Sequence, residues 1–225
     1  MEGDNKMKVL QISPFLNEQH GGTEVYCFNL SKKLVKEGHE IHIFTSKTKK
    51  RTPKYQYLEG VHIHRFNAPV VLWNINPICF MLDRLIKEKC DIYHVHSHLY
   101  FTSNQASIAK LIRKKIGRNL PLILHLHGGV GTPPKNISLE KKIAKKLYDQ
   151  TLGKLTLKTA DMILSTSQHD ARKVVKQFKV NPQKIEIIPN AVNTEEFKPK
   201  RKKTTTKTSI YCTLGTSNHG KVFNT

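Results

Sequence analysis

His127 is the residue whose type and position carry the clearest potential for chemistry in this 225-residue chain. It follows an apolar run at 122–126 and precedes Gly128 and Gly129, which leave the backbone open to a ligand. An imidazole at the end of a strand can donate a hydrogen bond to a substrate hydroxyl or to a developing charge. The alternative is a buried histidine that a backbone carbonyl satisfies.

A second candidate is the glycine pair Gly21 and Gly22, just before a helical pattern. Backbone N–H groups without neighbouring Cβ atoms can approach an anion, and the helix dipole favours negative charge there. The pair predicts a phosphate or sugar contact, with a flexible helix cap as the alternative. It is not GxGxxG, and no Walker lysine follows, so dinucleotide and P-loop sites are disfavoured.

Three histidines, His94, His96 and His98, alternate along one predicted strand, which would place them on one face. Imidazole is a common metal ligand, but no nearby carboxylate or thiol completes a set. We therefore expect histidines packed against backbone, no metal ion and no resident cofactor.

The elements that must position these residues alternate between β-rich and amphipathic runs. This pattern predicts an α/β fold, a Rossmann-like parallel sheet with helices on both faces. Ligands of such sheets bind beyond the carboxyl ends of the strands. The predicted strands are 8–13, 40–45, 61–64, 91–97, 122–126, 161–165 and 185–188, and the helices are 23–36, 76–89, 103–115, 138–159 (with Gly153 as a weak point) and 168–178. The residues that this rule gathers are Gly21, Gly22, His96, Ser97, His127, Gly128, Ser167 and Asn190.

Charge points to anionic partners. The 38 Lys and Arg against 17 Asp and Glu give a net charge of +21. The lysine-rich helices at 110–115 and 141–158 could lie on an anionic membrane surface, or could be plain solvated faces. RNA binding is open on charge, but the aromatic interleaving of a stacking platform is not obvious, so we expect no specific nucleic acid.

Expectations about location follow from three features of the sequence. Residues 1–8 carry no apolar run typical of a signal peptide, and no stretch approaches the ~18 apolar residues of a membrane span. Four widely spaced cysteines suggest reduced thiols rather than a disulfide framework. We expect a cytoplasmic protein, with peripheral association at the inner membrane face as a further expectation.

Taken together, the motifs resemble the N-terminal, acceptor-side domain of a GT-B-fold glycosyltransferase of family 4. The resemblance covers most of residues 7–199, with Ala191 and Asn193 as mild departures where the family usually has Gly and Asp. The segments that carry it are 7–12 with the later glycine pair, 34–41, 91–96, 124–128, 160–167 and 188–193.

This resemblance implies transfer of a sugar from a nucleotide-sugar donor to a lipid or saccharide acceptor, usually with retention and without a protein nucleophile. By position, Gly21 and Gly22 would meet the donor phosphate or the acceptor. His127 would contact the donor sugar near the reacting centre. Residues around His96 and Ser167 would line the cleft.

The domain organisation expected is a family 4-like N-terminal domain at 1–197 and a basic linker with an aberrant, disordered tail at 198–225. The donor-binding domain of the family is not found after the linker. A shifted reading of the codons from Ile210 onward permits residues that match its opening, so we hypothesise a frameshift near Lys202 and Lys203. The chain alone would then have little activity. The alternatives are a split enzyme and a non-catalytic module that binds anionic lipid or RNA.

Overall fold

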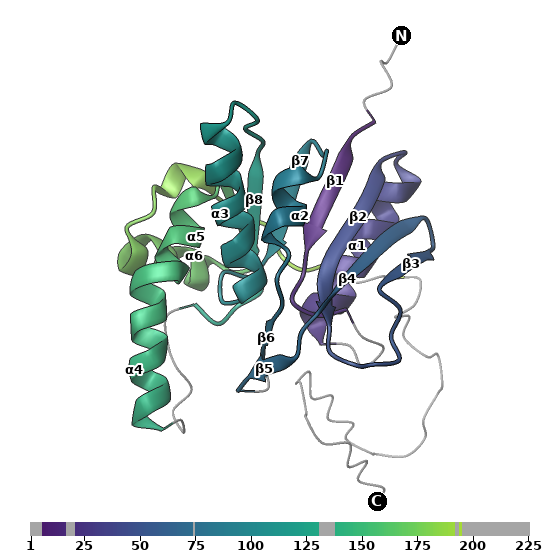
Figure 1. The fold of residues 1–225 in the computed structure, drawn as a ribbon. Helices are drawn as coiled ribbons and strands as arrows, with labels where there is room; N and C mark the ends of the chain where they lie inside the picture. The colour runs from purple at the N-terminus through teal and green to yellow at the C-terminus, as the bar shows by residue number, and fades with distance from the viewer. Residues whose placement is uncertain (1–5, 17–20, 74, 131–137, 192–193, 195–225) are drawn as a thin grey trace, which may run out of the picture. The chain divides into compact units, whose positions relative to one another are not determined.

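The computed structural model describes residues 6–16, 21–73, 75–130, 138–191 and 194 (Figure 1). The chain divides into two units, residues 1–189 and 190–225. The second unit is described only at Asn190, Ala191 and Thr194, so the fold below is that of the first. The tail predicted at 198–225 lies outside the described residues, and the domain boundary at 197 stays a prediction.

An eight-stranded sheet forms the centre of the first unit, in the order β10-β9-β8-β7-β1-β2-β4-β3. Strand β3 runs antiparallel to β4, and the other neighbours pair in parallel. A separate hairpin joins β5 and β6. The strands are β1 Lys8–Ile12, β2 Glu40–Lys47, β3 Tyr55–Leu58, β4 Val61–Asn67, β5 Val70–Leu72, β6 Asn76–Ile78, β7 Ile92–His96, β8 Leu122–Leu126, β9 Met162–Ser165 and β10 Ile185–Ile187.

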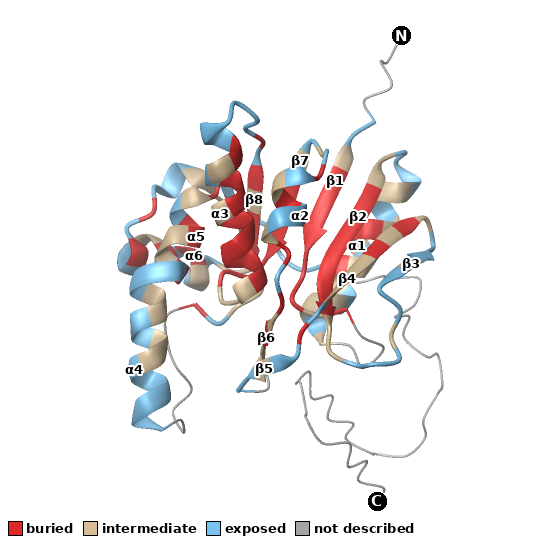
Figure 2. Cartoon of the chain, in the orientation of Figure 1, coloured by how far each residue is buried: buried red, intermediate tan, exposed pale blue. Residues whose placement is uncertain are grey.

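Helices cover both faces of this sheet, because successive side chains of each strand point to opposite sides. In β1, Val9 packs in the cluster that contains Cys27 of α1, whereas Leu10 packs in the cluster that contains Ala106 of α3. Helices α2, α5 and α6 also contribute to the cluster that contains Leu10 (Figures 1 and 2). The helices are α1 Gly22–Lys36, α2 Leu82–Lys87, α3 Phe101–Lys115, α4 Leu139–Tyr148, the π-helical η1 Asp149–Gly153, α5 Lys154–Thr159, α6 Gln168–Phe178 and the 3₁₀ turn η2 Pro182–Lys184.

The predicted fold class is confirmed, with one antiparallel edge that the sequence did not indicate. Strand β3 connects to β4 through Glu59 and Gly60, both with positive φ (49° and 83°). The helical region predicted over 138–159 is irregular near its predicted weak point, because a π-helical turn ends at Gly153.

The helix predicted over 76–89 is wrong at its start. Residues Asn76–Ile78 form β6, and the helix begins at Leu82. The side chain of Gln105 on α3 decides this boundary. Its Oε1 accepts hydrogen bonds from the backbone N–H of Met81 (2.8 Å) and Leu82 (3.0 Å), which satisfies the start of α2 from another element.

Candidate functional site

Four histidines gather where β7 and β8 lie side by side. His94 and His96 of β7, His125 of β8 and His127 just after it lie on the α1 face of the sheet. Their rings stack, with centroids 4.4 Å apart for His125 and His127 and 5.2 Å apart for His96 and His127. Tyr26 of α1 covers the stack edge-on, 5.1 Å from His127. Two of the predicted site residues, His96 and His127, are thus in one cluster.

A chain of hydrogen bonds ties this stack to the body of the protein. Ser31 donates to the carbonyl oxygen of Cys27 (2.8 Å), so its Oγ can accept from Nε2 of Gln11 (3.0 Å). The other amide atom, Oε1 of Gln11, lies 2.6 Å from Nε2 of His96. The remaining ring nitrogen of His96, Nδ1, lies 2.9 Å from Nε2 of His127.

This series of hydrogen bonds determines the tautomers of His96 and His127. Because Oε1 of Gln11 only accepts, His96 must carry its proton on Nε2, which leaves Nδ1 as an acceptor. His127 must then donate from its own Nε2. The Nδ1 of His127 is left as a lone-pair acceptor. The expectation that His127 donates a hydrogen bond to a ligand stays a prediction; within the described network, its Nε2 donates to His96 and its Nδ1 is an acceptor.

Burial keeps the whole stack uncharged. Desolvation, helped by the neighbouring histidines, lowers the pKa of His94 and His127 to about 3. It lowers the pKa of His125 to about 4 and that of His96 well below its ordinary value. Neutral imidazoles suit hydrogen bonding to sugar hydroxyls better than proton donation at neutral pH.

The glycine pair lies at the start of α1, one turn before Tyr26. Gly21 is the extended cap residue and α1 begins at Gly22, so the first N–H groups of the helix have no intrahelical partner. A Cβ on Gly22 would come within 4 Å of no atom of the described residues. Because Tyr26 contacts His127, the helix start and the imidazole are on the same side of the sheet, as predicted.

The backbone turns sharply after β7 and after β8. Ser97 has φ 65°, and Gly128 and Gly129 have φ 96° and 76°. The turn at Ser97 reverses the side on which His98 points, so the expectation that His94, His96 and His98 share a face is wrong. His98 packs instead against Phe178 of α6, with ring centroids 5.9 Å apart.

Ser167 and Asn190 are not brought into the histidine stack by any described contact. The hydroxyl of Ser167 caps α6 by accepting from the N–H of Asp170 (3.1 Å), which accounts for this serine structurally. Asn190 is exposed and belongs to the second unit. Their predicted roles in ligand binding stay predictions.

Histidines at alternating positions are a common source of metal ligands. Among the described residues, no group of three or more His, Cys, Asp or Glu side chains is arranged to hold a metal ion. The same alternating spacing recurs at His62 and His64 of β4, which stack on His42 of β2.

No helix in the described ranges is long and apolar enough to cross a membrane.

Sequence reasoning missed three residues of this site: Gln11, Tyr26 and Ser31. Gln11 offered a signal, since a fully buried amide inside an apolar strand must find hydrogen-bond partners. Which partners it finds depends on the register of β1 against β7, where Gln11 lies opposite His94. Tyr26 and Ser31 gave no signal beyond their place on a helix.

The fold is that of the Rossmann-like half of GT-B-fold glycosyltransferases. The sequence profile of Glycosyltransferase Family 4 matches residues 20–196. The chain therefore belongs to glycosyltransferase family 4, as its motifs predicted.

Curated relatives agree with this assignment. The chain is 26% identical over 196 residues to a D-inositol 3-phosphate glycosyltransferase of Nocardioides, covering 82% of this chain and 41% of the relative. It is 24% identical over 196 residues to the phosphatidylinositol N-acetylglucosaminyltransferase gpi3 subunit of Schizosaccharomyces pombe (84% and 40%). It is also 26% identical over 227 residues to the UDP-Gal:alpha-D-GlcNAc-diphosphoundecaprenol alpha-1,3-galactosyltransferase of Escherichia coli (97% and 53%). The chain thus covers between 40% and 53% of the length of these relatives.

Solved structures show the same fold. Sucrose-phosphate synthase from Thermosynechococcus elongatus matches with a TM-score of 0.60 at 16% identity, over 86% of this chain and 50% of that one. The catalytic domain of starch synthase IV from Arabidopsis thaliana matches with a TM-score of 0.53 at 12% identity, over 85% and 53%.

Proposed function

We propose that this chain is the acceptor-side half of a glycosyltransferase that moves a sugar from a nucleotide-sugar donor to a lipid or saccharide acceptor with retention. The observation that carries the proposal is the hydrogen-bond chain from Gln11 through His96 to His127. It supports a neutral imidazole at the sheet edge, beside the open start of α1. No metal ion or resident cofactor is part of the proposal.

Each candidate residue has a defined task in this proposal. Nδ1 of His127 accepts a hydrogen bond from a hydroxyl of the donor sugar and so orients the anomeric carbon. The first N–H groups of α1, at Gly22, face phosphate oxygens of the donor or acceptor. The bond from the anomeric carbon to the diphosphate breaks, and a bond to the acceptor oxygen forms. The proton of the acceptor hydroxyl leaves with the diphosphate, without a protein nucleophile.

The acceptor class is proposed from relatives. Their names specify an inositol 3-phosphate, a phosphatidylinositol and a diphosphoundecaprenol-linked sugar, which all carry phosphate. Two of these are lipids. A phosphate-bearing acceptor also suits a chain with a net charge of +21. We propose that the chain acts on the cytoplasmic side, peripherally at a membrane surface.

Activity is proposed to require a second, donor-binding domain. The matched region covers only 41% and 40% of two of the relatives, and binding of the donor diphosphate needs cations that the site cluster does not supply. Residues 1–197 would then bind the acceptor, while a donor-binding domain completes the enzyme.

The test is sugar transfer by the chain together with a donor-binding domain, supplied in one of two ways. The reading frame is restored after Lys203, or a co-purifying Rossmann-like partner chain is added, and uridine, guanosine and adenosine diphosphate sugars are screened with phosphate-bearing acceptors. We expect turnover in the completed enzyme and little in the chain alone. A downstream frame that encodes no glycosyltransferase domain, with no such partner chain and no response of the chain to sugar nucleotides, would refute the proposal.

A further inference from the structure

Helix α4 carries an unusually exposed row of apolar side chains. Leu139, Ile143 and Leu147 are 72%, 59% and 62% exposed. They are spaced four residues apart, so they form one stripe along the helix. Every residue of α4 is partly or fully exposed, so the helix is held by little packing of its own. An exposed apolar stripe of this kind indicates an interaction surface.

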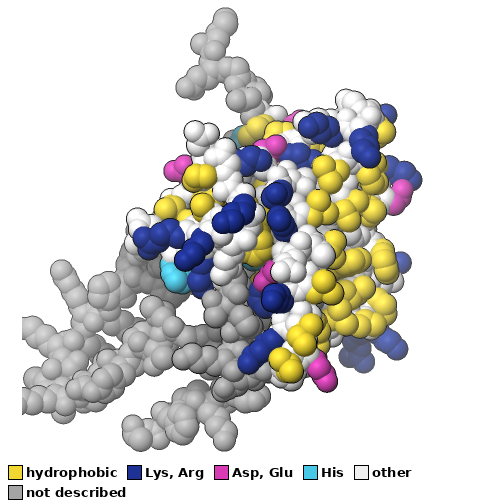
Figure 3. All heavy atoms as spheres, turned by 90° about the vertical axis from the view of Figure 1, so that its left-hand side faces the viewer, with side chains coloured by type: hydrophobic (Ala, Val, Ile, Leu, Met, Phe, Trp, Pro, Cys, Tyr) yellow, Lys and Arg dark blue, Asp and Glu magenta, His cyan; other side chains and the backbone are white. Residues whose placement is uncertain are grey.

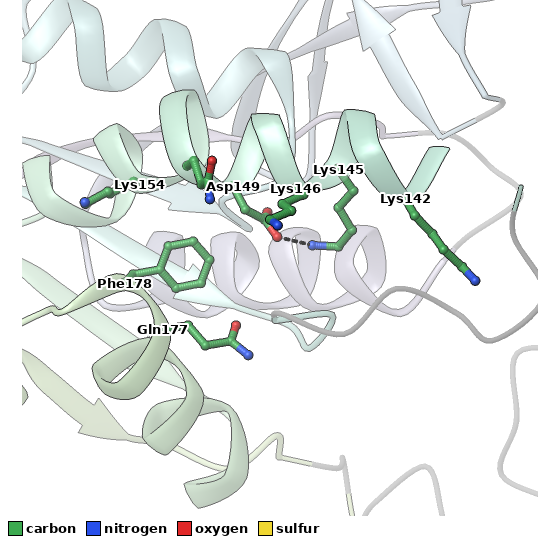
Figure 4. Close-up of a pocket in the computed structure, with 8 residues that line it drawn as sticks. Lys142, Lys145, Lys146, Asp149, Lys154, Gln177 and Phe178 are labelled. Atoms are coloured by element: carbon green, nitrogen blue, oxygen red, sulfur yellow. Dashed lines mark hydrogen bonds and ion pairs between the residues drawn. The ribbon is translucent and has the colours of Figure 1, made fainter. Parts of the chain in front are cut away.

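Lysines border this stripe on one side. Lys142 and Lys146 lie next to it on the helix and, with Lys145 and Lys154, line a groove of about 680 Å³ beside Gln177 and Phe178 of α6 (Figure 4). Lys145 is neutralised by Asp149 at 2.6 Å. Lys142, Lys146 and Lys154 form no ion pair with another described residue. Figure 3 shows this side of the molecule, where lysine and arginine side chains are interspersed with hydrophobic ones.

The opposite face of α4 is hydrogen-bonded to the residues that follow β7. Tyr148 lies nine residues after Leu139, half a turn away around the helix axis. Its hydroxyl lies 2.8 Å from the carbonyl oxygen of His98 and 3.0 Å from Oδ1 of Asn104. His98 follows directly on the turn at the end of β7. Whatever binds the stripe is therefore held at a fixed place relative to the carboxyl edge of the sheet.

These features select one occupant. A second copy of the chain would bring Lys142 and Lys146 against their own equivalents, at a cost in repulsion. An anionic bilayer instead offers phosphates to the lysines and an apolar layer to the stripe in the same plane. We propose that α4 is a membrane-docking helix, whose apolar stripe enters the headgroup region of an anionic bilayer while the groove lysines contact lipid phosphates. This rests on the proposed function insofar as a lipid-linked acceptor would be presented at that surface.

Vesicle co-sedimentation of the full chain tests this at near-physiological salt, ~0.15 M, where weak long-range attraction is screened. Phosphatidylcholine vesicles with and without phosphatidylglycerol are compared. The triple variant L139A/I143A/L147A keeps helix propensity and removes the stripe. The variant K142Q/K146Q/K154Q removes the unpaired groove charges. Each should lower partition onto anionic vesicles by about tenfold or more.

The other basic helix, α3, provides matched controls. Its exposed end carries Leu111 and Ile116, and Lys114, Lys115 and Arg118 lie beside them. The variants L111A/I116A and K114Q/K115Q/R118Q make the same kinds of change at a different place. Both should bind vesicles like the unmodified chain. Circular dichroism and thermal melts check that every variant folds.

Insertion of α4 into the bilayer is measured separately, by tryptophan fluorescence. Trp73 is the single tryptophan, so W73F/I143W and W73F/I116W each carry one reporter. Emission of the first should shift to the blue on anionic vesicles and be quenched by brominated lipid, while the second should not change. Equal loss in the α3 controls would show charge-driven adsorption and overturn the proposal. So would unaltered binding of the stripe variant, or a stripe-dependent self-association. The measurement contains no sugar nucleotide or acceptor, so it can fail while transfer to a water-soluble acceptor succeeds, and the reverse.

Discussion

His96 and His127 share a hydrogen bond between ring nitrogens, 2.9 Å from Nδ1 of one to Nε2 of the other. The bond links the last residue of β7 to the residue that follows β8. Since the far side of His96 is held by Gln11, the orientation and the tautomer of His127 are set from the interior of the sheet. A residue at a loop start thereby gains the rigidity of the strands, which is what positioning of a sugar requires.

Removal of this imidazole should affect transfer more than folding. In the completed enzyme, His127→Ala should lower kcat by about 100-fold, because a preorganised hydrogen bond near the reacting centre is lost. His62→Ala on β4 is the control, since that histidine lies in a different cluster with His42 and Tyr57. Equal rates for His127→Ala and the unmodified enzyme would remove His127 from the site.

Gln11 is predicted to act through His96 as a positioning residue. Gln11→Leu removes the acceptor that holds the His96 proton on Nε2, so His127 can rotate or adopt its other tautomer. Turnover should fall by about tenfold, the equivalent of one ordinary hydrogen bond. Nuclear magnetic resonance of labelled imidazoles should show both tautomers of His127 in this variant. A single unchanged tautomer would contradict the relay.

Whether the sequence predicted a feature of this site depends on how far apart in the sequence the interacting residues lie. Strands β1, β7 and β8 were found because each is a short, mostly buried run of largely aliphatic and aromatic residues. Strand β6 was missed because it is three residues long, contains Pro77 and pairs only with β5 in the described sheet. The start of α2 was missed because Gln105, which accepts from the N–H groups of Met81 and Leu82, lies 23 to 24 residues further along the chain. His98 was misplaced because the positive φ of Ser97 has no signature in a non-glycine residue. The relay could not be derived, since it needs the registers of β1, β7 and β8 together.

Substitutions can distinguish a ligand-binding role of Gly22, at the start of α1, from a structural role of Gly128, in the turn after β8. Gly22→Ala meets open space at the start of α1 and should leave the melting temperature unchanged or slightly higher. Any loss of turnover would then report the approach of a ligand to the backbone. Gly128→Ala, at φ 96°, should instead destabilise the fold by about 1–2 kcal/mol. Full activity of Gly22→Ala would place the ligand elsewhere.

Stability should fall in acid because of the histidine stack. The pKa values of His94, His125 and His127 are lowered in the fold, to about 3, 4 and 3, so the unfolded chain binds more protons below its ordinary histidine pKa near 6.5. The stabilisation is complete above that value and is lost as the pH falls toward 4. Each histidine contributes a slope of up to about 1.4 kcal/mol per pH unit. Urea melts between pH 7 and 4.5 measure it.

His125 offers a clean variant for this titration. Neither of its ring nitrogens has a hydrogen-bond partner among the described residues. His125→Phe keeps an aromatic ring in the stack and removes one titrating group. The free energy of unfolding at pH 7 should be retained, and its slope below pH 6.5 should fall by about one proton. An unchanged slope would mean that His125 is not protonated on unfolding in this range.

The last prediction concerns the ion pair that joins α3 to the start of β9. Lys110, whose side chain is 6% exposed, contacts Asp161, and the same carboxylate oxygen accepts from the N–H of Leu122 at 2.7 Å. Asp161→Ala leaves a buried ammonium group without its partner and should cost about 2–3 kcal/mol in unfolding free energy. Lys110→Met should cost less, because its apolar chain fills the same space and Asp161 is half-exposed. If the stranded charge is the cause, Lys110→Met should recover part of the loss when added to Asp161→Ala. A double variant as unstable as the sum of the two single variants would show that the hydrogen bond to Leu122, rather than the charge, is what matters.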